Sequence, residues 1–557
     1  MANNQGYQEF VKRLDEVCTQ YADKVAIEYM RNDGSKTSFS FGEISEKIRT
    51  AKKLFDEVKL RPGDRVAIVA PLSPLALFVV IALGYSNITS VILDANLPQE
   101  EIDRLIENSD VRAIFTTPSL YGLLDEKLLK DIPVFDISKT SLEFGLFKDS
   151  QKQNTRSITS DADISVFTIL FSSGTTDSMK GVMMTYISAI RTFEINIPLQ
   201  RIDSTGSYLH VLPLNHIAGL VSVVAFFGGA TIGMIEEADA TKLKNALLDF
   251  EPTHFAMVPR VYEVMERKIK QEIISKGKIV SSIVFALIAI SGFMRKIFGI
   301  NLGKNIFKSV RNQIFGANFR VMVVGGSLCS ESTAKFFLSL GVGMWANYYA
   351  TTETNVPAVV TCAADRFPIN TVGNVKRYDD IKIEILDPDE NGIGEICVKT
   401  ALIMKGYFRD PELTAAAFDE DGYFKTGDLG YIDKKGYLHV TGRIKEAIML
   451  HTGKKVAPSD VDTLYSGICS PNIILASCGV PSRDESFDEI HMFIESGNLS
   501  PEEQEEAKKN ILDFSAQTST LYQIANVHFI EKIPTTSVGK VKRFQLREIA
   551  LSERAEK

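Results

Sequence analysis

The sequence lacks several features that mark whole classes of protein. Its 557 residues include 37 Gly and 19 Pro, which is no excess of either and excludes a fibrous repeat or extended disorder. With 62 Lys and Arg against 70 Asp and Glu, the net charge is -8, so no overall positive field exists to hold a nucleic acid. Six cysteines are scattered without a Cys-x-x-Cys pair or a zinc-spaced histidine cluster. This pattern favours reduced thiols and a cytoplasmic location.

Targeting and membrane segments are also missing by sequence criteria. The first residues, Met-Ala-Asn-Asn-Gln-Gly, have neither the basic flank nor the apolar core of a signal peptide. The longest uncharged apolar stretch, 279–294, is shorter than the roughly 20 residues that cross a bilayer. We therefore expect a soluble, enzyme-sized protein of several domains, because domains average roughly 100 to 200 residues.

The texture of the chain changes along its length. Up to about residue 370, apolar runs of strand length alternate with helical patterns, which predicts βαβ units and a mainly parallel sheet. From about residue 379, short alternating runs separated by Asp-Pro, Asn-Gly and Asp-Gly predict antiparallel hairpins. The segment after Arg443 has its own strand pattern at 476–480 and a charged helix pattern at 501–514 that follows Ser500 as N-cap. It is long enough to form a small separate domain.

A loop rich in glycine and hydroxyl groups occupies residues 172–181. It reads Ser-Ser-Gly-Thr-Thr-Asp-Ser-Met-Lys-Gly and follows the apolar run 166–171. Glycine lets the backbone approach an anion, hydroxyls and amides donate hydrogen bonds, and Lys180 adds a positive charge, so the composition suits a polyphosphate. The Walker pattern G-x-x-x-x-G-K-S/T does not occur, which excludes a P-loop. A surface turn rich in Ser and Thr is the alternative for this loop taken alone.

The loop resembles the Ser/Thr-Ser-Gly-Thr-Thr-Gly-x-Pro-Lys-Gly motif of AMP-forming adenylate-forming enzymes, which include acyl-CoA synthetases, luciferases and peptide-synthetase adenylation domains. It departs from that motif at Asp177, where Gly is usual, and at Met179, where Pro is usual. Other segments of the family follow in order: Arg61-Pro-Gly-Asp-Arg-Val, Leu212-Pro-Leu-Asn-His-Ile-Ala-Gly, Gly325-Gly-Ser, Asn347-Tyr-Tyr-Ala-Thr-Thr-Glu, Thr426-Gly-Asp-Leu, Gly442-Arg and Ile533-Pro-Thr-Thr-Ser-Val-Gly-Lys. One such match is weak, whereas an ordered series along most of the chain identifies a family.

The resemblance implies an α/β fold. A large N-terminal domain, 1–443, would hold mainly parallel sheets flanked by helices and a small antiparallel β-barrel-like subdomain. A small mobile α+β C-terminal domain, 444–557, would carry the catalytic lysine and turn about a hinge near Lys445. The reaction implied is attack of a carboxylate on the α-phosphorus of ATP, in which positioning and positive charge do most of the catalysis.

The resemblance also implies a role for each matching residue. The residues that would embrace the β and γ phosphates are Ser172, Ser173, Gly174, Thr175, Thr176 and Lys180. Those on the nucleoside side are Gly326, Ser327 and Asn347, which would face adenine, Tyr349, and Asp428 and Arg443 at the ribose. Those at the reacting groups are Thr352 on the α-phosphate, Glu353 on Mg²⁺, and Lys540 as the catalytic cation. His216 and Gly325 would border the acid, His216 at the acyl entrance, and Gly453 would admit pantetheine.

The identity of the substrate acid is the least determined part of the predicted reaction. Val258-Pro-Arg-Val-Tyr-Glu resembles a run of long-chain fatty-acyl-CoA synthetases and precedes, as there, an insertion at about 266–318. We expect a medium- or long-chain fatty acid, with coenzyme A as acceptor. A separate acyl carrier protein as acceptor, or a non-catalytic nucleotide-binding regulator, are the alternatives. Asp177 would repel ATP, and the apolar stretch 279–298 could contact a membrane surface or pack as a helix pair.

Overall fold

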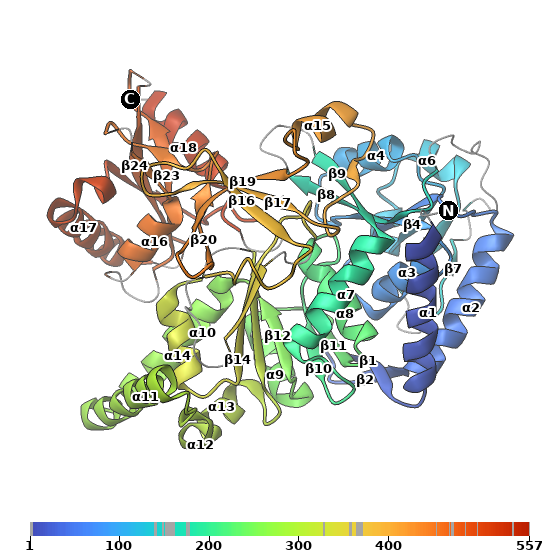
Figure 1. Ribbon diagram of the computed structural model, residues 1–557, viewed down its shortest axis with the longest axis horizontal. Helices are drawn as coiled ribbons and strands as arrows, with labels where there is room; N and C mark the ends of the chain where they lie inside the picture. Colours follow the sequence, from blue (N-terminus) through green and yellow to red (C-terminus); the bar gives the residue numbers. More distant parts are fainter. Residues whose placement is uncertain are drawn as a thin grey trace.

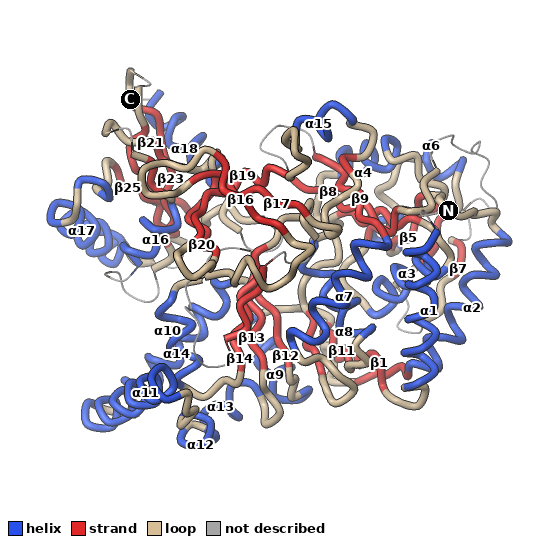
Figure 2. Tube along the Cα trace, in the orientation of Figure 1, coloured by secondary structure: helices blue, strands red, loops and turns tan. Residues whose placement is uncertain are grey.

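The computed structural model describes residues 4–555 apart from 139–141, 148–149, 151–161, 174–178, 327–328, 356–358, 364–370, 453, 467, 469–472, 485, 498 and 537–539. The described α-helices are α1 (Gln5–Gln20), α2 (Phe41–Glu57), α3 (Pro74–Tyr85), α4 (Gln99–Asn108), α5 (Pro118–Tyr121), α6 (Glu126–Asp131), α7 (Tyr186–Gln200), α8 (Val221–Phe227), α9 (Ala240–Phe250), α10 (Pro259–Ser275), α11 (Lys278–Phe298), α12 (Gly303–Ile306), α13 (Lys308–Phe315), α14 (Glu331–Ser339), α15 (Pro411–Ala416), α16 (Pro458–Ser466), α17 (Pro501–Gln517) and α18 (Arg543–Ala555). Strands fill the middle of each lobe and helices cover them (Figures 1 and 2).

Two eight-stranded sheets form the larger part of the molecule. The first has the order β15 (Val359–Ala363), β14 (Met344–Tyr349), β13 (Val321–Gly325), β12 (His254–Met257), β10 (Ser207–His210), β11 (Thr231–Ile235), β1 (Val25–Met30) and β2 (Lys36–Ser40). The second has the order β18 (Gly406–Tyr407), β9 (Met179–Thr185), β8 (Val166–Ser173), β4 (Thr89–Leu93), β3 (Arg65–Val69), β5 (Ala113–Thr116), β6 (Val134–Asp136) and β7 (Gly145–Leu146). Inner strands pair in parallel and antiparallel pairs stand at the edges. The mainly parallel architecture predicted from the sequence is confirmed.

The remaining strands are antiparallel or mixed. One four-stranded antiparallel sheet has the order β16 (Lys382–Leu386), β17 (Gly394–Lys399), β19 (Phe424–Ile432) and β20 (Leu438–Arg443). The C-terminal part holds the hairpin β21 (Ile448–Met449) and β22 (Lys455–Val456), and a mixed sheet of β23 (Leu475–Pro481), β24 (Asp488–Glu495) and β25 (Asn526–Ile530). Figure 1 shows this part beside β19 and β20, away from the N-terminal helices. The predicted change to antiparallel hairpins after residue 379 is therefore correct.

Hydrophobic burial explains why the elements assemble in these groups. Helix α3 is buried on every side from Pro74 to Gly84, and it begins where the Ser73 hydroxyl accepts a hydrogen bond from the amide of Ala76. It belongs to a core that also joins α1, α2, α7 and α8 to both large sheets. Two further cores consist only of residues from 448 to 550. The boundary near residue 443 stays a prediction, although the C-terminal part has apolar cores of its own.

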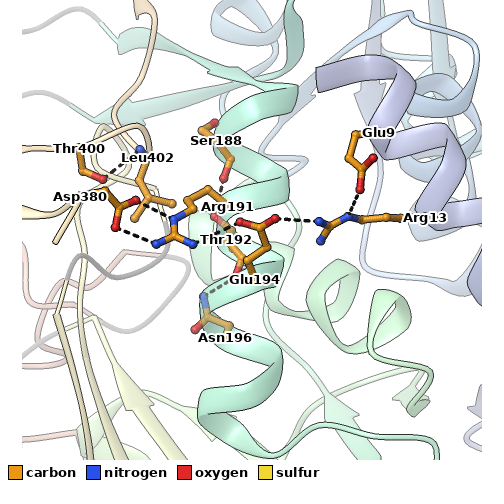
Figure 3. A network of polar contacts seen from close by, with 10 residues as sticks. All are labelled: Glu9, Arg13, Ser188, Arg191, Thr192, Glu194, Asn196, Asp380, Thr400 and Leu402. Carbon is orange, nitrogen blue, oxygen red and sulfur yellow. Dashed lines mark hydrogen bonds and ion pairs between the residues drawn. The ribbon is translucent and has the colours of Figure 1, made fainter. Parts of the chain in front are cut away.

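A polar network links helices α1 and α7 to the chain just before β16 (Figure 3). Arg191 forms two hydrogen bonds with Asp380, of 2.8 and 2.7 Å, and a third with Glu194 at 3.2 Å. Arg13 bonds to the same Glu194 at 2.7 Å and to Glu9 at 2.7 Å. Paired, bidentate guanidinium contacts are directional, so the network orients the four-stranded sheet relative to the N-terminal helices.

The apolar stretch that the sequence placed at 279–294 forms a longer helix than expected. Helix α11 has 21 residues, because the charged residues at its ends continue the helix until Gly299, whose φ of 72° ends it. Within the described residues it is the one helix long and apolar enough to cross a membrane by length and composition. The length expected from the uncharged stretch alone was therefore too short for this helix. The error arose from counting only uncharged residues.

Candidate active site

Asp428 lies where the four-stranded sheet meets the first large sheet. It stands opposite Arg443 in the register of β19 and β20, and Arg443 Nε is 3.0 Å from Asp428 Oδ1. The hydroxyl of Tyr349 from β14 donates to Asp428 Oδ2 at 2.9 Å. Burial raises the pKa of Asp428, and the charge of Arg443, the Tyr349 hydroxyl and the charge of Lys540 act against that rise. The structure thus brings together three residues that the sequence assigned to the nucleoside.

The neighbouring strands β13 and β14 end beside this carboxylate. Gly325 is the last residue of β13, and Gly326 follows with a φ of 91°, which favours glycine. Asn347 is buried on β14, and its Nδ2 donates to the carbonyl of Thr371 at 3.2 Å. Ser327 lies outside the described residues. Carboxyl ends of parallel strands are the usual place for ligands in open α/β sheets, so this edge is where a nucleotide would fit.

Lys540 reaches the same edge from the C-terminal part of the chain. A methyl group built on Gly326 would lie 3.5 Å from Lys540 Cε, so the lysine side chain runs directly past this glycine. The Lys540 amide donates to Thr536 Oγ1 at 3.1 Å, and the Thr536 amide donates to the Lys540 carbonyl at 2.8 Å. Burial lowers the pKa of Lys540, the charge of Arg443 lowers it further, and the charge of Asp428 opposes both. The C-terminal part is therefore docked with its lysine inside the site.

Glu353 forms a second cluster with a residue that the sequence reading missed. The hydroxyl of Tyr407, from β18, donates to Glu353 Oε1 at 3.0 Å, and Lys180 Nζ lies 5.4 Å from the centroid of the Tyr407 ring. Lys180 stands opposite Ser172 in the β8–β9 pair, so both ends of the glycine-rich loop are anchored on neighbouring strands. Gly174, Thr175 and Thr176 lie outside the described residues, as does the side chain of Ser173. In the sequence Tyr407 follows Lys405-Gly406, a pair that is typical of an ordinary turn and gives no sign of a site.

A short turn presents Thr352 next to Glu353. The amide of Thr351 donates to Thr354 Oγ1 at 2.9 Å, and the amide of Thr354 donates to Thr351 Oγ1 at 3.2 Å. These reciprocal bonds hold the backbone of residues 351–354 in one shape. Thr352 and Glu353 are both half-buried there, which suits groups that meet a ligand.

His216 is close enough to Lys540 to be affected by its charge. Burial lowers the pKa of His216 to about 4, and the positive charge of Lys540 contributes. Its Nδ1 accepts a hydrogen bond from the Ala218 amide at 3.1 Å, so the ring caps the short helix Ile217–Leu220 as a neutral imidazole. The structure thus places His216 near Lys540, the predicted catalytic cation, and its role toward the acid stays a prediction.

Lys445 and Gly453 are the residues predicted to serve the transfer of the acyl group to coenzyme A. Lys445 is exposed in the turn that follows β20, where the amides of Glu446 and Ala447 bond to the carbonyl of Arg443. That position suits a hinge, which stays a prediction. Gly453 lies outside the described residues.

A buried polar cluster behind β14 had no sequence signal. The hydroxyl of Tyr348 donates to Asn196 Oδ1 at 2.8 Å and accepts a hydrogen bond from Gln200 Nε2. Asn196 and Gln200 are fully buried on α7, and a methyl group at Gly325 would lie 3.2 Å from Tyr348 Cβ. The cluster therefore fixes β14 from the side opposite Tyr349.

A divalent cation fits this site only together with substrate oxygens. Among the described residues, no group of three or more His, Cys, Asp or Glu side chains is placed to hold a metal ion. Mg²⁺ commonly uses one or two carboxylates plus phosphates and waters, and the oxygens of Glu353 suit that arrangement. Glu353 would hold the cation and thereby offset the negative charge of the phosphates.

Known proteins resemble this chain along most of its length. The AMP-binding enzyme family matches residues 14–408. The chain belongs to this family. It is 26% identical over 542 residues to 4-coumarate–CoA ligase 2 of Petroselinum crispum, covering 93% of this chain and 90% of the relative. It is 25% identical over 471 residues to long chain acyl-CoA synthetase 1 of Arabidopsis thaliana, covering 76% of this chain and 70% of the relative. The resemblance stated from motifs is confirmed.

Solved structures share the fold of this AMP-binding enzyme. ATP-bound MatB from Rhodopseudomonas palustris has a TM-score of 0.71 and 21% identity, covering 97% of this chain and 98% of that chain. O-succinylbenzoate coenzyme A synthetase (MenE) from Bacillus subtilis, in complex with AMP, has a TM-score of 0.70 and 19% identity, covering 96% of this chain and 98% of that chain. At these identities the likeness establishes the fold, and the chemistry must be argued from this chain's own residues.

Proposed function

We propose that this protein activates a carboxylic acid with ATP and transfers the acyl group to coenzyme A. A carboxylate oxygen attacks the α-phosphorus, the bond to the bridging oxygen of the β-phosphate breaks, and pyrophosphate leaves. A thiolate then attacks the acyl carbonyl, and AMP leaves. The observation that carries this proposal is Lys540, which the C-terminal part places beside Gly326 and near enough to Arg443 and Asp428 for their charges to shift its pKa.

Each described group has a physical task in the first step. The Lys540 ammonium stabilises the negative charge that develops between the carboxylate and the α-phosphate, because it is half-buried and already positioned. Asp428, held by Tyr349 and Arg443, offers carboxylate oxygens to the ribose hydroxyls. Lys180 counters the charge of the phosphates, and Glu353 would hold a Mg²⁺ ion that would supply further positive charge.

For the acid, we propose a medium- or long-chain fatty acid. Support comes from the run Val258–Glu263 and from relatives named for long-chain acids. One of them is long-chain-fatty-acid–CoA ligase heimdall of Drosophila melanogaster, 30% identical over 329 residues that cover 55% of this chain and 47% of the relative. In the structure the tyrosine of that run is a core residue, because Tyr262 is buried and its hydroxyl donates to the Phe255 carbonyl at 2.8 Å. The run therefore supports the fatty acid only through resemblance. An aryl acid is the competing candidate, since 4-coumarate–CoA ligases match more of the chain.

The test is a panel of acids assayed for ATP-dependent pyrophosphate release with and without coenzyme A. Saturated acids of increasing chain length and 4-coumarate would be compared, and the products would be identified by mass spectrometry. We expect the highest kcat/KM with a fatty acid and an acyl-CoA product. Pyrophosphate release without thioester formation would indicate transfer to a separate acyl carrier protein instead. No release with any acid would contradict the enzyme assignment and leave a nucleotide-binding regulator.

A further inference from the structure

Helix α11 carries its large apolar side chains on the side that faces solvent. Ile279, Ile283, Ile290, Phe293 and Ile297 are between 50% and 79% exposed and recur at intervals of three, four or seven residues, so they form one continuous stripe. The buried side chains of the helix are Ser281, Ile288, Ser291 and Arg295. A helix on a soluble domain normally has the opposite arrangement, with its apolar stripe against the core. The exposed stripe therefore needs a partner outside the folded chain.

The orientation of α11 is fixed by hydrogen bonds from its polar side. Arg295 donates from Nη1 to the carbonyls of Leu338 at 2.9 Å and Val342 at 2.7 Å, and from Nη2 to Gly343 at 3.0 Å. The Ser291 hydroxyl donates to the Ser339 carbonyl at 2.7 Å. Turning the apolar stripe inward would rotate Arg295 and Ser291 outward, and the carbonyls that accept their hydrogen bonds would lose these donors, which is costly. The helix projects from the lower edge of the molecule (Figure 1), so its outer side is accessible.

The charge of the surrounding segment indicates what the partner is. Residues 273–330 contain eight Lys and Arg and no Asp or Glu, whereas the rest of the chain has 54 Lys and Arg against 70 Asp and Glu. Five of these eight are exposed lysines at both ends of α11 and on the two short helices that follow: Lys276, Lys278, Lys296, Lys304 and Lys308. An apolar stripe bordered by lysines is complementary to a surface that is apolar inside and anionic outside.

We propose that α11 lies in the plane of an anionic lipid bilayer, with the Ile279–Ile297 stripe at the acyl boundary and the flanking lysines on the headgroups. A second copy of this chain fits less well, because either direction of helix pairing would place lysines against lysines with no carboxylate in the segment to pair with them. The helix does not span the bilayer, because α10 and α14 pack against it and Arg295 bonds its C-terminal end to the backbone of residues 338–343. The proposal rests on this surface and is independent of the acid the enzyme uses.

Vesicle flotation tests the proposal with the full-length protein and no substrate. Vesicles would contain phosphatidylcholine alone or phosphatidylcholine mixed with phosphatidylglycerol. We expect the protein to float with the mixed vesicles and to prefer them to the neutral ones. High salt should reduce this preference, because it screens the attraction between lysines and headgroups. In Ile283→Gln/Phe293→Gln, the partition coefficient should fall by roughly tenfold or more, because the buried apolar area is lost. In Lys278→Gln/Lys296→Gln, the preference for phosphatidylglycerol should fall by roughly tenfold.

Leu123→Gln is the matched control, since Leu123 is 58% exposed, as Ile283 is 56% exposed, and lies far from α11 in sequence. Its flotation should equal that of the wild-type protein. All variants should keep wild-type thermal unfolding, because the substitutions are on the surface. Wild-type protein that stays unbound, or Ile283→Gln/Phe293→Gln that floats like wild type, would overturn the proposal. A dimer in sedimentation velocity that dissociates in Ile283→Gln/Phe293→Gln, without vesicle binding, would assign the stripe to a second copy instead.

Discussion

Replacement of Lys540 by alanine is the most direct test of the site. The side chain passes Gly326 closely enough that a methyl group there would lie 3.5 Å from Lys540 Cε, and burial together with Arg443 lowers its pKa. The side chain thus lies at the site before the reaction, so removal of its ammonium costs electrostatic stabilisation and leaves the other groups where they are.

The size of the loss follows from the environment of the charge. Two unit charges about 4 Å apart interact by about 4 kcal/mol at the effective dielectric constant of roughly 20 that describes sites near a protein surface. Each factor of ten in rate corresponds to about 1.4 kcal/mol, and one preorganised donor is typically worth about 10²- to 10³-fold. We therefore expect Lys540→Ala to slow adenylation by about 10²- to 10³-fold.

Pyrophosphate exchange into ATP measures adenylation alone, and thioester formation from presynthesised acyl-AMP measures the second step alone. Lys540→Ala should depress the exchange and change the second step little. Lys532→Ala removes an exposed lysine of the same segment and should leave both rates near wild type. Exchange at the wild-type rate in Lys540→Ala would refute the role given to this residue.

Four further predictions concern other groups. Lys445→Pro should spare pyrophosphate exchange and reduce thioester formation tenfold or more, about the effect of blocking a hinge, and equal loss of both would argue against one. Tyr407→Phe removes the hydrogen bond to Glu353, whose loss costs about 1 kcal/mol, so the Mg²⁺ concentration for half-maximal activity should rise several-fold. An unchanged Mg²⁺ titration would contradict this. Asp177→Gly, outside the described residues, should lower the KM for ATP by relieving repulsion; an equal or higher KM would reject that idea. Burial, His528 and Arg554 lower the pKa of His491 to about 4 in the folded protein. Between about pH 6.5 and 4 the unfolded protein therefore binds a proton at this histidine that the folded protein does not bind. The free energy of unfolding should fall as the pH drops through that window, by up to about 3 kcal/mol. Denaturant unfolding of His491→Gln should show a flatter acid slope than wild type, and an identical slope would contradict the assignment.

Much of the fold could be predicted because local patterns and burial agree. The charged helix after Ser500 forms as α17 with a capping box between Ser500 and Glu503, as its N-cap pattern indicated. The strand predicted at 476–480 is β23. Helix α11 was misjudged in length, since its lysine and arginine ends are helical, and nothing in its composition showed that its apolar side faces outward.

The sequence by itself determined the family, through motifs in a fixed order, and the resemblance predicted Lys540, Asp428, Arg443 and Glu353 as site residues, because motif residues can be matched one by one along the chain. Only the tertiary structure decided that Tyr407 holds Glu353, that Tyr348 bonds to α7, and that the stripe on α11 is exposed. The two hydrogen bonds join residues separated by 54 and 152 positions in the sequence. The exposure of the stripe depends on which side of α11 is bonded to the rest of the protein. Periodicity describes neighbours within one element, whereas such contacts exist only once the elements have packed together.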